Sequence, residues 1–135
     1  MNKNKLIEML IRHEGLHLKP YKCPSGFITI GVGRNLETKG ISQGEAIMLL
    51  QHDIEDAEKK LNTIPIFKKL SENRKAVLID MCINLGFQGL QSFKKMWIAL
   101  EQNKFDIATA EMLNSKWHEQ VGNRAIELAH IMFIG

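Results

Sequence analysis

The sequence has few of the features that mark secreted or membrane proteins. It contains two cysteines, Cys23 and Cys82, in 135 residues, which is too few for a disulfide framework, so we expect free thiols in a reducing compartment. No apolar run approaches the roughly 20 residues that a membrane-spanning helix needs. The charged N-terminus also lacks the apolar core of a signal peptide. We therefore expect no leader segment and no stable association with a membrane.

Repeats, linkers and low-complexity stretches are also missing. With 44% hydrophobic and 24% charged residues, the chain is expected to form one domain over residues 1–135. The net charge of +3 is modest, and basic and acidic residues alternate along most predicted helices, which is typical of a solvated surface. Nucleic acid is not an expected partner. A helical DNA-binding module, suggested by the isoelectric point of about 8.9, stays an alternative that salt-sensitive DNA binding would reveal.

The first third of the chain predicts a helix followed by a small β region. Apolar residues recur at helical spacing over residues 4–14, and Gly15 is a natural stop. Residues 20–26 are rich in turn formers. Residues 27–33 alternate as a short strand does. We therefore predict an N-terminal helix, a turn and a β-hairpin.

The rest of the chain predicts helices only. Ser42 and Glu45 have the spacing of a capping box, which starts a helix near Gln43 that continues to about Asn62. Pro65 opens the next turn. The overall class is therefore α+β and mostly helical.

A segment that is apolar nearly all round, residues 76–85, predicts a helix buried on every side. Amphipathic helices are expected around it at about 90–101, 105–113 and 123–133. The core of this region is expected to contain seven methionine and phenylalanine residues: Met81, Met96, Met112, Met132, Phe93, Phe105 and Phe133. This pattern indicates packing and predicts no cofactor.

Glu14 is the first candidate for chemistry. Its carboxyl would hang from a helix C-terminus, where the partial negative charge of the helix favours the protonated form. Such a group can act as a general acid. Eight residues separate Glu14 from Cys23, and five separate Cys23 from Thr29, so all three are expected near the helix end and the hairpin.

This spacing, together with Thr-Ile-Gly-Val-Gly-Arg at residues 29–34, resembles the phage-type lysozymes of glycoside hydrolase family 24. The resemblance continues through residues 80–86, 89–93, 115–117 and 123–125. It implies a lysozyme-like fold with a small N-terminal lobe (about 1–41), a connecting helix (about 42–62), a helical C-terminal lobe (about 63–135) and a cleft between the lobes.

The resemblance also implies roles for individual residues. Glu14 supplies the proton, Cys23 occupies a position that holds Asp or Cys in the family, and Thr29 positions water. Arg124 resembles the arginine that pairs with the catalytic glutamate, while Asn84 and Trp117 match cleft positions that contact an N-acetyl group and a sugar face. Arg34 stands where many relatives have His, so a histidine–carboxylate pair is absent.

Three roles for Cys23 stay open. It could be a thiolate nucleophile, a thiolate that stabilises positive charge, or a weak hydrogen-bonding group that Thr29 and water assist. An unperturbed thiol is ionised only near pH 8.5, so the first two roles need a thiolate at lower pH.

The function that the resemblance implies is hydrolysis of the β-1,4 bond between N-acetylmuramic acid and N-acetylglucosamine in peptidoglycan. The protein would be a monomeric endolysin without metal or cofactor. It would accumulate in the host cytoplasm, pass through a holin pore and act on the wall in the periplasm.

Two alternatives use the same residues. A lysozyme fold with little activity could serve as a wall-binding protein, because Cys23 replaces a carboxylate. His13-Glu14-Gly-Leu-His17 also spells the H-E-x-x-H motif of zinc metallopeptidases, which needs both histidines on one continuous helix. Gly15 and Pro20 argue against that helix.

Overall fold

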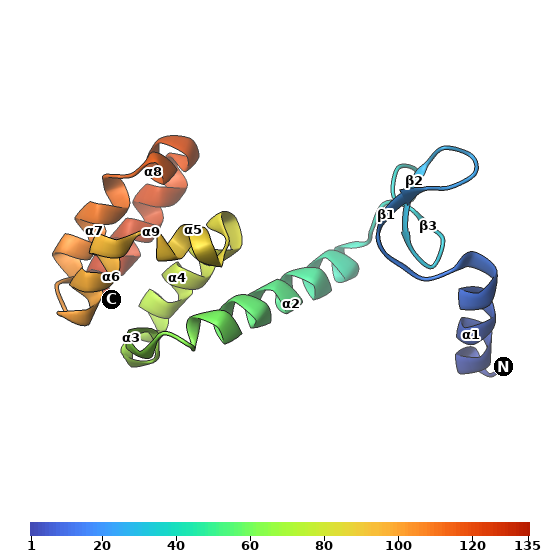
Figure 1. Cartoon of the computed structure of the whole chain (residues 1–135), viewed down its shortest axis with the longest axis horizontal. Helices are drawn as coiled ribbons and strands as arrows, with labels where there is room; N and C mark the ends of the chain where they lie inside the picture. Colours follow the sequence, from blue (N-terminus) through green and yellow to red (C-terminus); the bar gives the residue numbers. More distant parts are fainter. The chain divides into compact units, whose positions relative to one another are not determined.

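The computed structural model describes all residues from Met1 to Gly135. It has an α+β architecture with nine helices and one three-stranded sheet. The chain divides into two units, Met1–Met48 and Leu49–Gly135. The boundary falls inside the long helix α2 (Gln43–Leu61), which is green in Figure 1.

The N-terminal unit begins with α1 (Lys3–Glu14), as the apolar spacing predicts. Asn2 caps its start, because the side-chain oxygen accepts from the backbone N–H of Lys5 at 3.1 Å. Gly15 ends it in a left-handed conformation, with φ of 80°, and donates its N–H to the carbonyl of Ile11 at 2.8 Å. The predicted end at Glu14 is confirmed.

Three antiparallel strands follow, β1 (His17–Lys22), β2 (Ile28–Gly31) and β3 (Arg34–Asn35), in the order β1-β2-β3. The prediction of a turn over residues 20–26 was wrong at its start, since β1 continues to Lys22. Pro20 is tolerated because β1 is an edge strand and its pairing with β2 shifts register between His17 and Tyr21. The turn itself is confined to Cys23–Gly26.

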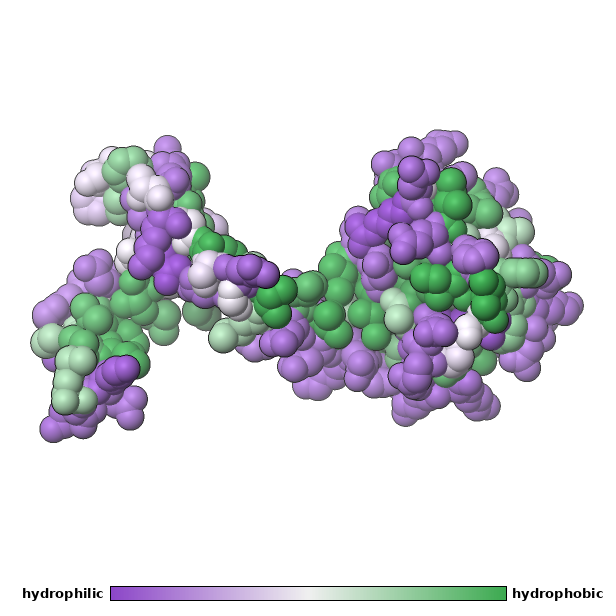
Figure 2. All heavy atoms as spheres, turned by 180° about the vertical axis from the view of Figure 1, so that it is seen from behind, coloured by the Kyte–Doolittle hydropathy of each residue, from purple (hydrophilic) through white to green (hydrophobic).

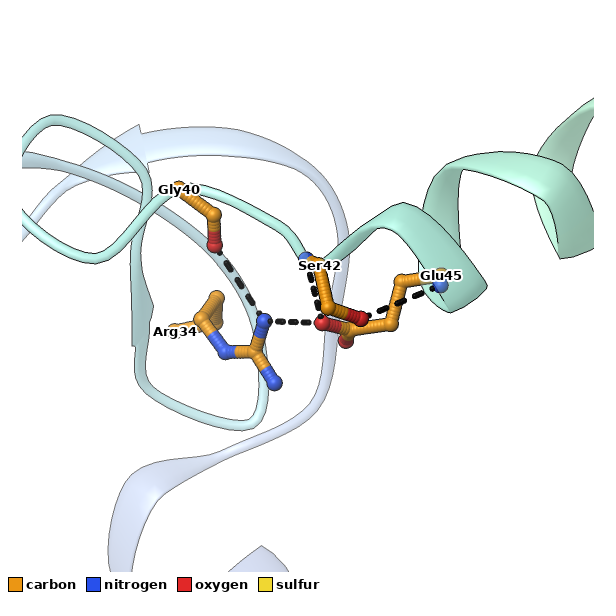
Figure 3. Close-up of polar contacts among 4 residues, drawn as sticks. All are labelled: Arg34, Gly40, Ser42 and Glu45. Carbon is orange, nitrogen blue, oxygen red and sulfur yellow. Dashed lines mark hydrogen bonds and ion pairs between the residues drawn. The ribbon is translucent and has the colours of Figure 1, made fainter.

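The start of α2 is fixed by the predicted capping box. The hydroxyl of Ser42 accepts from the backbone N–H of Glu45 at 3.2 Å, and the Glu45 carboxylate accepts from the backbone N–H of Ser42 at 2.9 Å. The same carboxylate oxygen accepts from Nη1 of Arg34 on β3, also at 2.9 Å (Figure 3). Nη1 of Arg34 also donates to the carbonyl of Gly40 at 3.2 Å. These contacts join the sheet to the first turn of α2.

The second unit is entirely helical beyond α2. It contains α3 (Pro65–Lys69), α4 (Glu72–Leu85), α5 (Phe87–Gln91), α6 (Lys94–Glu101), α7 (Phe105–Leu113), α8 (Lys116–Val121) and α9 (Asn123–Ile134). In this unit α7 packs against α6 and α9, and α4 packs against α5 and α9 (Figure 1). The short helices α3 and α8 were not predicted.

The core of this unit confirms most of the predicted packing residues. Met81, Met96, Met112 and Met132 are fully buried, and Phe93 and Phe105 pack against the core. Phe133 is a correction, because it is 57% exposed in the last turn of α9. None of the helices combines the length and apolar composition needed to cross a bilayer.

Two helix predictions also need correction. The helix expected over 90–101 is broken between α5 and α6, where the Ser92 hydroxyl donates to the carbonyl of Gly89 at 2.5 Å and Phe93 has a non-helical ψ of 58°. The central helix α4 is not buried on every side, since within this unit Ile83 is 38% exposed. Figure 2 shows polar side chains over much of the visible surface, with apolar ones between them.

The Arg34–Glu45 pair predicts a pH dependence of stability. The hydrogen bond from Arg34 holds the pKa of Glu45 at about 2, below its ordinary value of 4.5. Because the pKa is lowered in the folded state, the ion pair stabilises the fold at pH values above the ordinary pKa. This stabilisation is lost as the pH falls towards about 2. We expect Glu45→Gln to lower the urea midpoint near neutral pH and to match the wild-type midpoint near pH 2.

The matched control is Glu37→Gln, because Glu37 is an exposed carboxylate of the same unit that makes no ion pair. Its midpoint should follow the wild type at both pH values. If the urea midpoint of Glu45→Gln were as far below that of the wild type near pH 2 as near neutral pH, the ion-pair explanation would be contradicted.

Candidate active site

Glu14 lies at the last position of α1 and its side chain packs against Gly33. A Cβ atom built on Gly33 would lie 2.6 Å from Oε2 of Glu14 and 3.0 Å from Cδ. Gly33 also has a left-handed φ of 67°, which favours glycine. The loop between β2 and β3 therefore approaches the carboxyl as closely as it does because residue 33 has no side chain.

The surroundings of Glu14 are partly apolar. A hollow of about 230 Å³ is lined by Glu14 together with Ile7, Leu10, Ile11 and Val32. Glu14 itself is exposed within its unit. An exposed carboxyl beside an apolar wall can reach a bound substrate and exchange a proton with it.

Cys23 opens the turn between β1 and β2. Its backbone N–H donates to the carbonyl of Phe27 at 2.9 Å, and its carbonyl accepts from Gly26 at 2.8 Å. The pKa of the thiol lies below its ordinary value, chiefly because the backbone amide of Phe27 hydrogen-bonds the sulfur and favours the thiolate. Desolvation opposes this shift, while weaker bonds from Ser25, Gly26 and the Thr29 side chain support it.

Thr29 lies in the middle strand β2, between Tyr21 of β1 and Asn35 of β3, and it is the only buried residue of its unit. Its hydroxyl donates to the carbonyl of Phe27 at 2.9 Å. A hydroxyl has one proton, so this bond competes with donation to the Cys23 sulfur. The structure thus brings Thr29 and Cys23 together, and the Phe27 backbone contributes more to the thiolate than Thr29 does.

Arg34 is adjacent to Gly33 in the chain, but its guanidinium is engaged by Glu45 and the carbonyl of Gly40 (Figure 3). Arg34 therefore joins β3 to the start of α2. Arg34 replaces the histidine found at this position in many relatives, and in this chain it pairs with the carboxylate of Glu45.

In the helical unit, Asn84 and Trp117 contact each other. The indole Nε1 donates to Oδ1 of Asn84 at 2.7 Å, and the Phe93 ring packs edge-on against the indole at 6.2 Å between centroids. Trp117 is only 3% exposed. Its burial favours a role as the anchor of Asn84 over the predicted packing on a sugar face.

A cavity of about 500 Å³ lies in the same unit. It is lined by residues of α4 to α8 and of the connections between them, among them Phe93, Met96, Asn114 and Trp117. Three lysines, Lys94, Lys95 and Lys116, and one carboxylate, Glu111, also line it. Trp117 therefore lines a cavity whose other residues are both apolar and basic.

Arg124, in the first turn of α9, pairs with Asp80 of α4. Nε and Nη2 of Arg124 both donate to Oδ1 of Asp80, at 2.9 and 2.7 Å. The predicted pairing of Arg124 with Glu14 joins residues of different units and stays a prediction.

The zinc-peptidase alternative is contradicted by the backbone. His13 belongs to α1, but the helix ends at Glu14, and His17 begins β1. The two histidines are therefore not one turn apart on a helix, which the H-E-x-x-H mechanism requires.

Three contact residues were not predicted from the sequence: Gly33 against Glu14, Glu45 with Arg34, and Asp80 with Arg124. Gly33 lies within the motif of residues 29–34, so the sequence singled out the residue but did not predict its contact with Glu14. Asp80 is 44 residues from Arg124, and no local pattern links residues at that separation.

Comparison with known proteins gives a consistent result over most of the chain. The model of the family described as Phage lysozyme matches residues 11–130. A probable T4-type lysozyme of Dictyostelium discoideum is 28% identical over 95% of this chain and 93% of its own length. An endolysin of Acyrthosiphon pisum secondary endosymbiont phage 1 is 30% identical over 84% of this chain and 77% of its own length.

A third relative places a similar sequence in a much longer protein. The pre-baseplate central spike protein Gp5 of Enterobacteria phage T4 is 25% identical over 96% of this chain but only 28% of its own length. The matched segment therefore makes up only part of that protein.

The environment of Cys23 predicts selective alkylation. Cys23 is half-buried with a lowered pKa, whereas Cys82 is buried in α4 and burial raises its pKa. Because the thiolate is the reactive form, we expect iodoacetamide to label Cys23 well before Cys82, with appreciable labelling below the roughly pH 8.5 of an ordinary thiol. Timed alkylation followed by peptide mass spectrometry measures both sites in one sample. Equal rates at the two cysteines would contradict the assigned environments.

Proposed function

The chain belongs to the phage lysozyme family, whose model matches residues 11–130, and from this premise we propose that it hydrolyses the β-1,4 bond between N-acetylmuramic acid and N-acetylglucosamine in peptidoglycan. The observation that carries the proposal is the matched set of Glu14, Cys23 and Thr29, with Glu14 at a helix end against Gly33. In this proposal residues 1–135 act as one lysozyme-like domain.

The proposed chemistry follows from the needs of glycoside hydrolysis. Glu14 gives its proton to the leaving glycosidic oxygen as the carbon–oxygen bond breaks, and a water oxygen then bonds the anomeric carbon while that water releases one proton to solvent. The carboxylate left on Glu14 is the group that must be reprotonated before the next cycle. Glu14 is exposed within its unit, so that proton can come from solvent.

Cys23 is proposed to act as a thiolate that stabilises positive charge on the sugar ring. The lowered pKa of the thiol supports this role over that of a neutral hydrogen-bonding group. Thr29 is proposed to hold the water, as its position in the family implies. Arg124, Asn84, Trp117 and Arg34 enter the proposal as supporting residues, with Arg34 acting through Glu45.

The biological setting is part of the same proposal. The protein would act as an endolysin that is synthesised in the host cytoplasm, reaches the wall through a holin pore and causes lysis. The similarity to a phage endolysin supports this assignment. Purified sacculi provide a direct test, because mass spectrometry of the released muropeptides identifies the bond that is cleaved.

The first prediction of the proposal concerns Glu14. Glutamine keeps the shape of the side chain but has no acidic proton, so Glu14→Gln should lose about 10²–10⁴-fold in the rate of muropeptide release. Since Glu14 is exposed within its unit, the free energy of unfolding should change by no more than about 0.5 kcal/mol.

The matched control is Glu8→Gln, which removes an exposed carboxylate from the same helix and should keep the wild-type rate. Retention of more than about a tenth of the rate in Glu14→Gln would sink the general-acid role. A wild type that binds sacculi and releases nothing would favour the wall-binding alternative.

The second prediction concerns the contact between Gly33 and Glu14. In Gly33→Ala the new methyl group would meet Oε2 at 2.6 Å, and the flexible carboxyl must move away. We expect the rate of muropeptide release to fall at least tenfold, because small displacements of a reacting group cost up to about 10²-fold. The left-handed backbone should also cost about 1–2 kcal/mol of stability.

Gly31→Ala separates the two effects. Gly31 has nearly the same φ, 69°, but no neighbouring atom lies within 4 Å of the place that a Cβ atom would take there. It should lose similar stability and keep most of the rate. Equal losses of rate in both variants would mean that backbone strain, and not displacement of Glu14, explains the effect.

A further inference from the structure

The contact between Arg124 and Asp80 fixes one edge of the guanidinium. Nε and Nη2 both donate to Oδ1 of Asp80, at 2.9 and 2.7 Å, and Nη2 also lies 3.5 Å from the Asp80 carbonyl oxygen. The guanidinium is planar, and Nη1 lies opposite the edge formed by Nε and Nη2. Nη1 makes no hydrogen bond in the structure, so it is the group that Arg124 can offer to another anion.

The pair is poorly placed to stabilise the fold. The side chains of Arg124 and Asp80 are 42% and 40% exposed, and ion pairs with that exposure typically contribute about 0–1 kcal/mol. The other ion pair of α4, Lys75 with Glu72, has a single contact of 3.3 Å between neighbours on one helix. The Arg124–Asp80 pair instead makes three contacts between two helices, which restrict the rotation of a long side chain.

The surroundings leave the arginine accessible. A hollow of about 250 Å³ beside the pair is lined by both residues and by Asn73, Val77 and Glu127 among others. Glu127, on α9, is the other charged side chain of that lining. No hydrogen bond joins it to Arg124, so Asp80 is the group that sets the orientation of the guanidinium.

We propose that Asp80 is a positioning residue, which holds the Nε and Nη2 edge of Arg124 against α4 and leaves Nη1 free to serve the reaction. This inference rests on the proposed function. In this proposal Asp80 affects the reaction only through Arg124. The effects of substitutions at the two positions on kcat/KM should therefore not add.

A double-mutant cycle on muropeptide release tests this dependence. Asp80→Ala should lower kcat/KM by about tenfold, mainly through kcat, because the arginine loses its fixed orientation. In the Arg124→Ala background the same substitution should have no further effect. Asp80→Asn should recover activity relative to Asp80→Ala, since the amide oxygen can accept from both nitrogens.

The matched control is Glu72→Ala, which breaks the other ion pair of α4 without touching Arg124 and should leave kcat/KM unchanged. A loss in Glu72→Ala as large as that in Asp80→Ala would overturn the proposal. An undiminished loss on adding Asp80→Ala to Arg124→Ala would also overturn it.

A second measurement does not depend on activity. The Nε–H signal of Arg124 in a ¹H–¹⁵N spectrum should be sharp and slow to exchange in the wild type and in Glu72→Ala, and it should broaden in Asp80→Ala. An unchanged signal in Asp80→Ala would overturn the positioning role even where activity is lost. A wild type that releases no muropeptides would overturn the proposed function and with it the service of Asp80 to catalysis, while the Nε–H signal would still report whether Asp80 holds Arg124.

Discussion

The left-handed backbone at Gly15 is the constraint on which the N-terminal unit depends. With φ of 80°, this residue ends α1 and turns the chain into β1 two residues later. A longer helix would place Glu14 inside a regular turn and would remove the strand that pairs with β2. Because the helix ends where it does, Glu14 projects from a helix terminus towards the loop of Gly33, whose missing side chain admits the carboxyl.

In the helical unit, arginine side chains join α4 and α9 at both ends of α9. At its start, Arg124 is held by Asp80 of α4. At its end, Nε of Arg74, also on α4, donates to the carbonyl of Met132 at 2.8 Å, and the guanidinium stacks on the Phe105 ring at 3.3 Å. Arg74 thereby satisfies a helix-end carbonyl that has no partner within the helix. The two arginines differ in role. Arg74 caps the C-terminus of α9, whereas Arg124 keeps Nη1 without a hydrogen bond.

The elements that could be predicted were those set by neighbouring residues. The end of α1 at Glu14 and the capping box of Ser42 and Glu45 each depend on contacts within four residues. The errors came where longer-range pairing overrode local preference. Residues 20–22 have the composition of a turn, yet they join β1 because β2 offers a partner along the edge of the sheet.

By itself the sequence determined the end of α1, the start of α2 and most of the core of the helical unit. It also showed the spacing of Glu14, Cys23 and Thr29 that resembles the family pattern. These properties follow from backbone conformation, hydrophobic periodicity and spacing, all of which are local. Only the tertiary structure decided the carboxylate partners of Arg34 and Arg124. Arg34 meets a carboxylate 11 residues away and Arg124 one 44 residues away. Charge makes any carboxylate a possible partner, and only packing brings one particular pair within hydrogen-bonding distance.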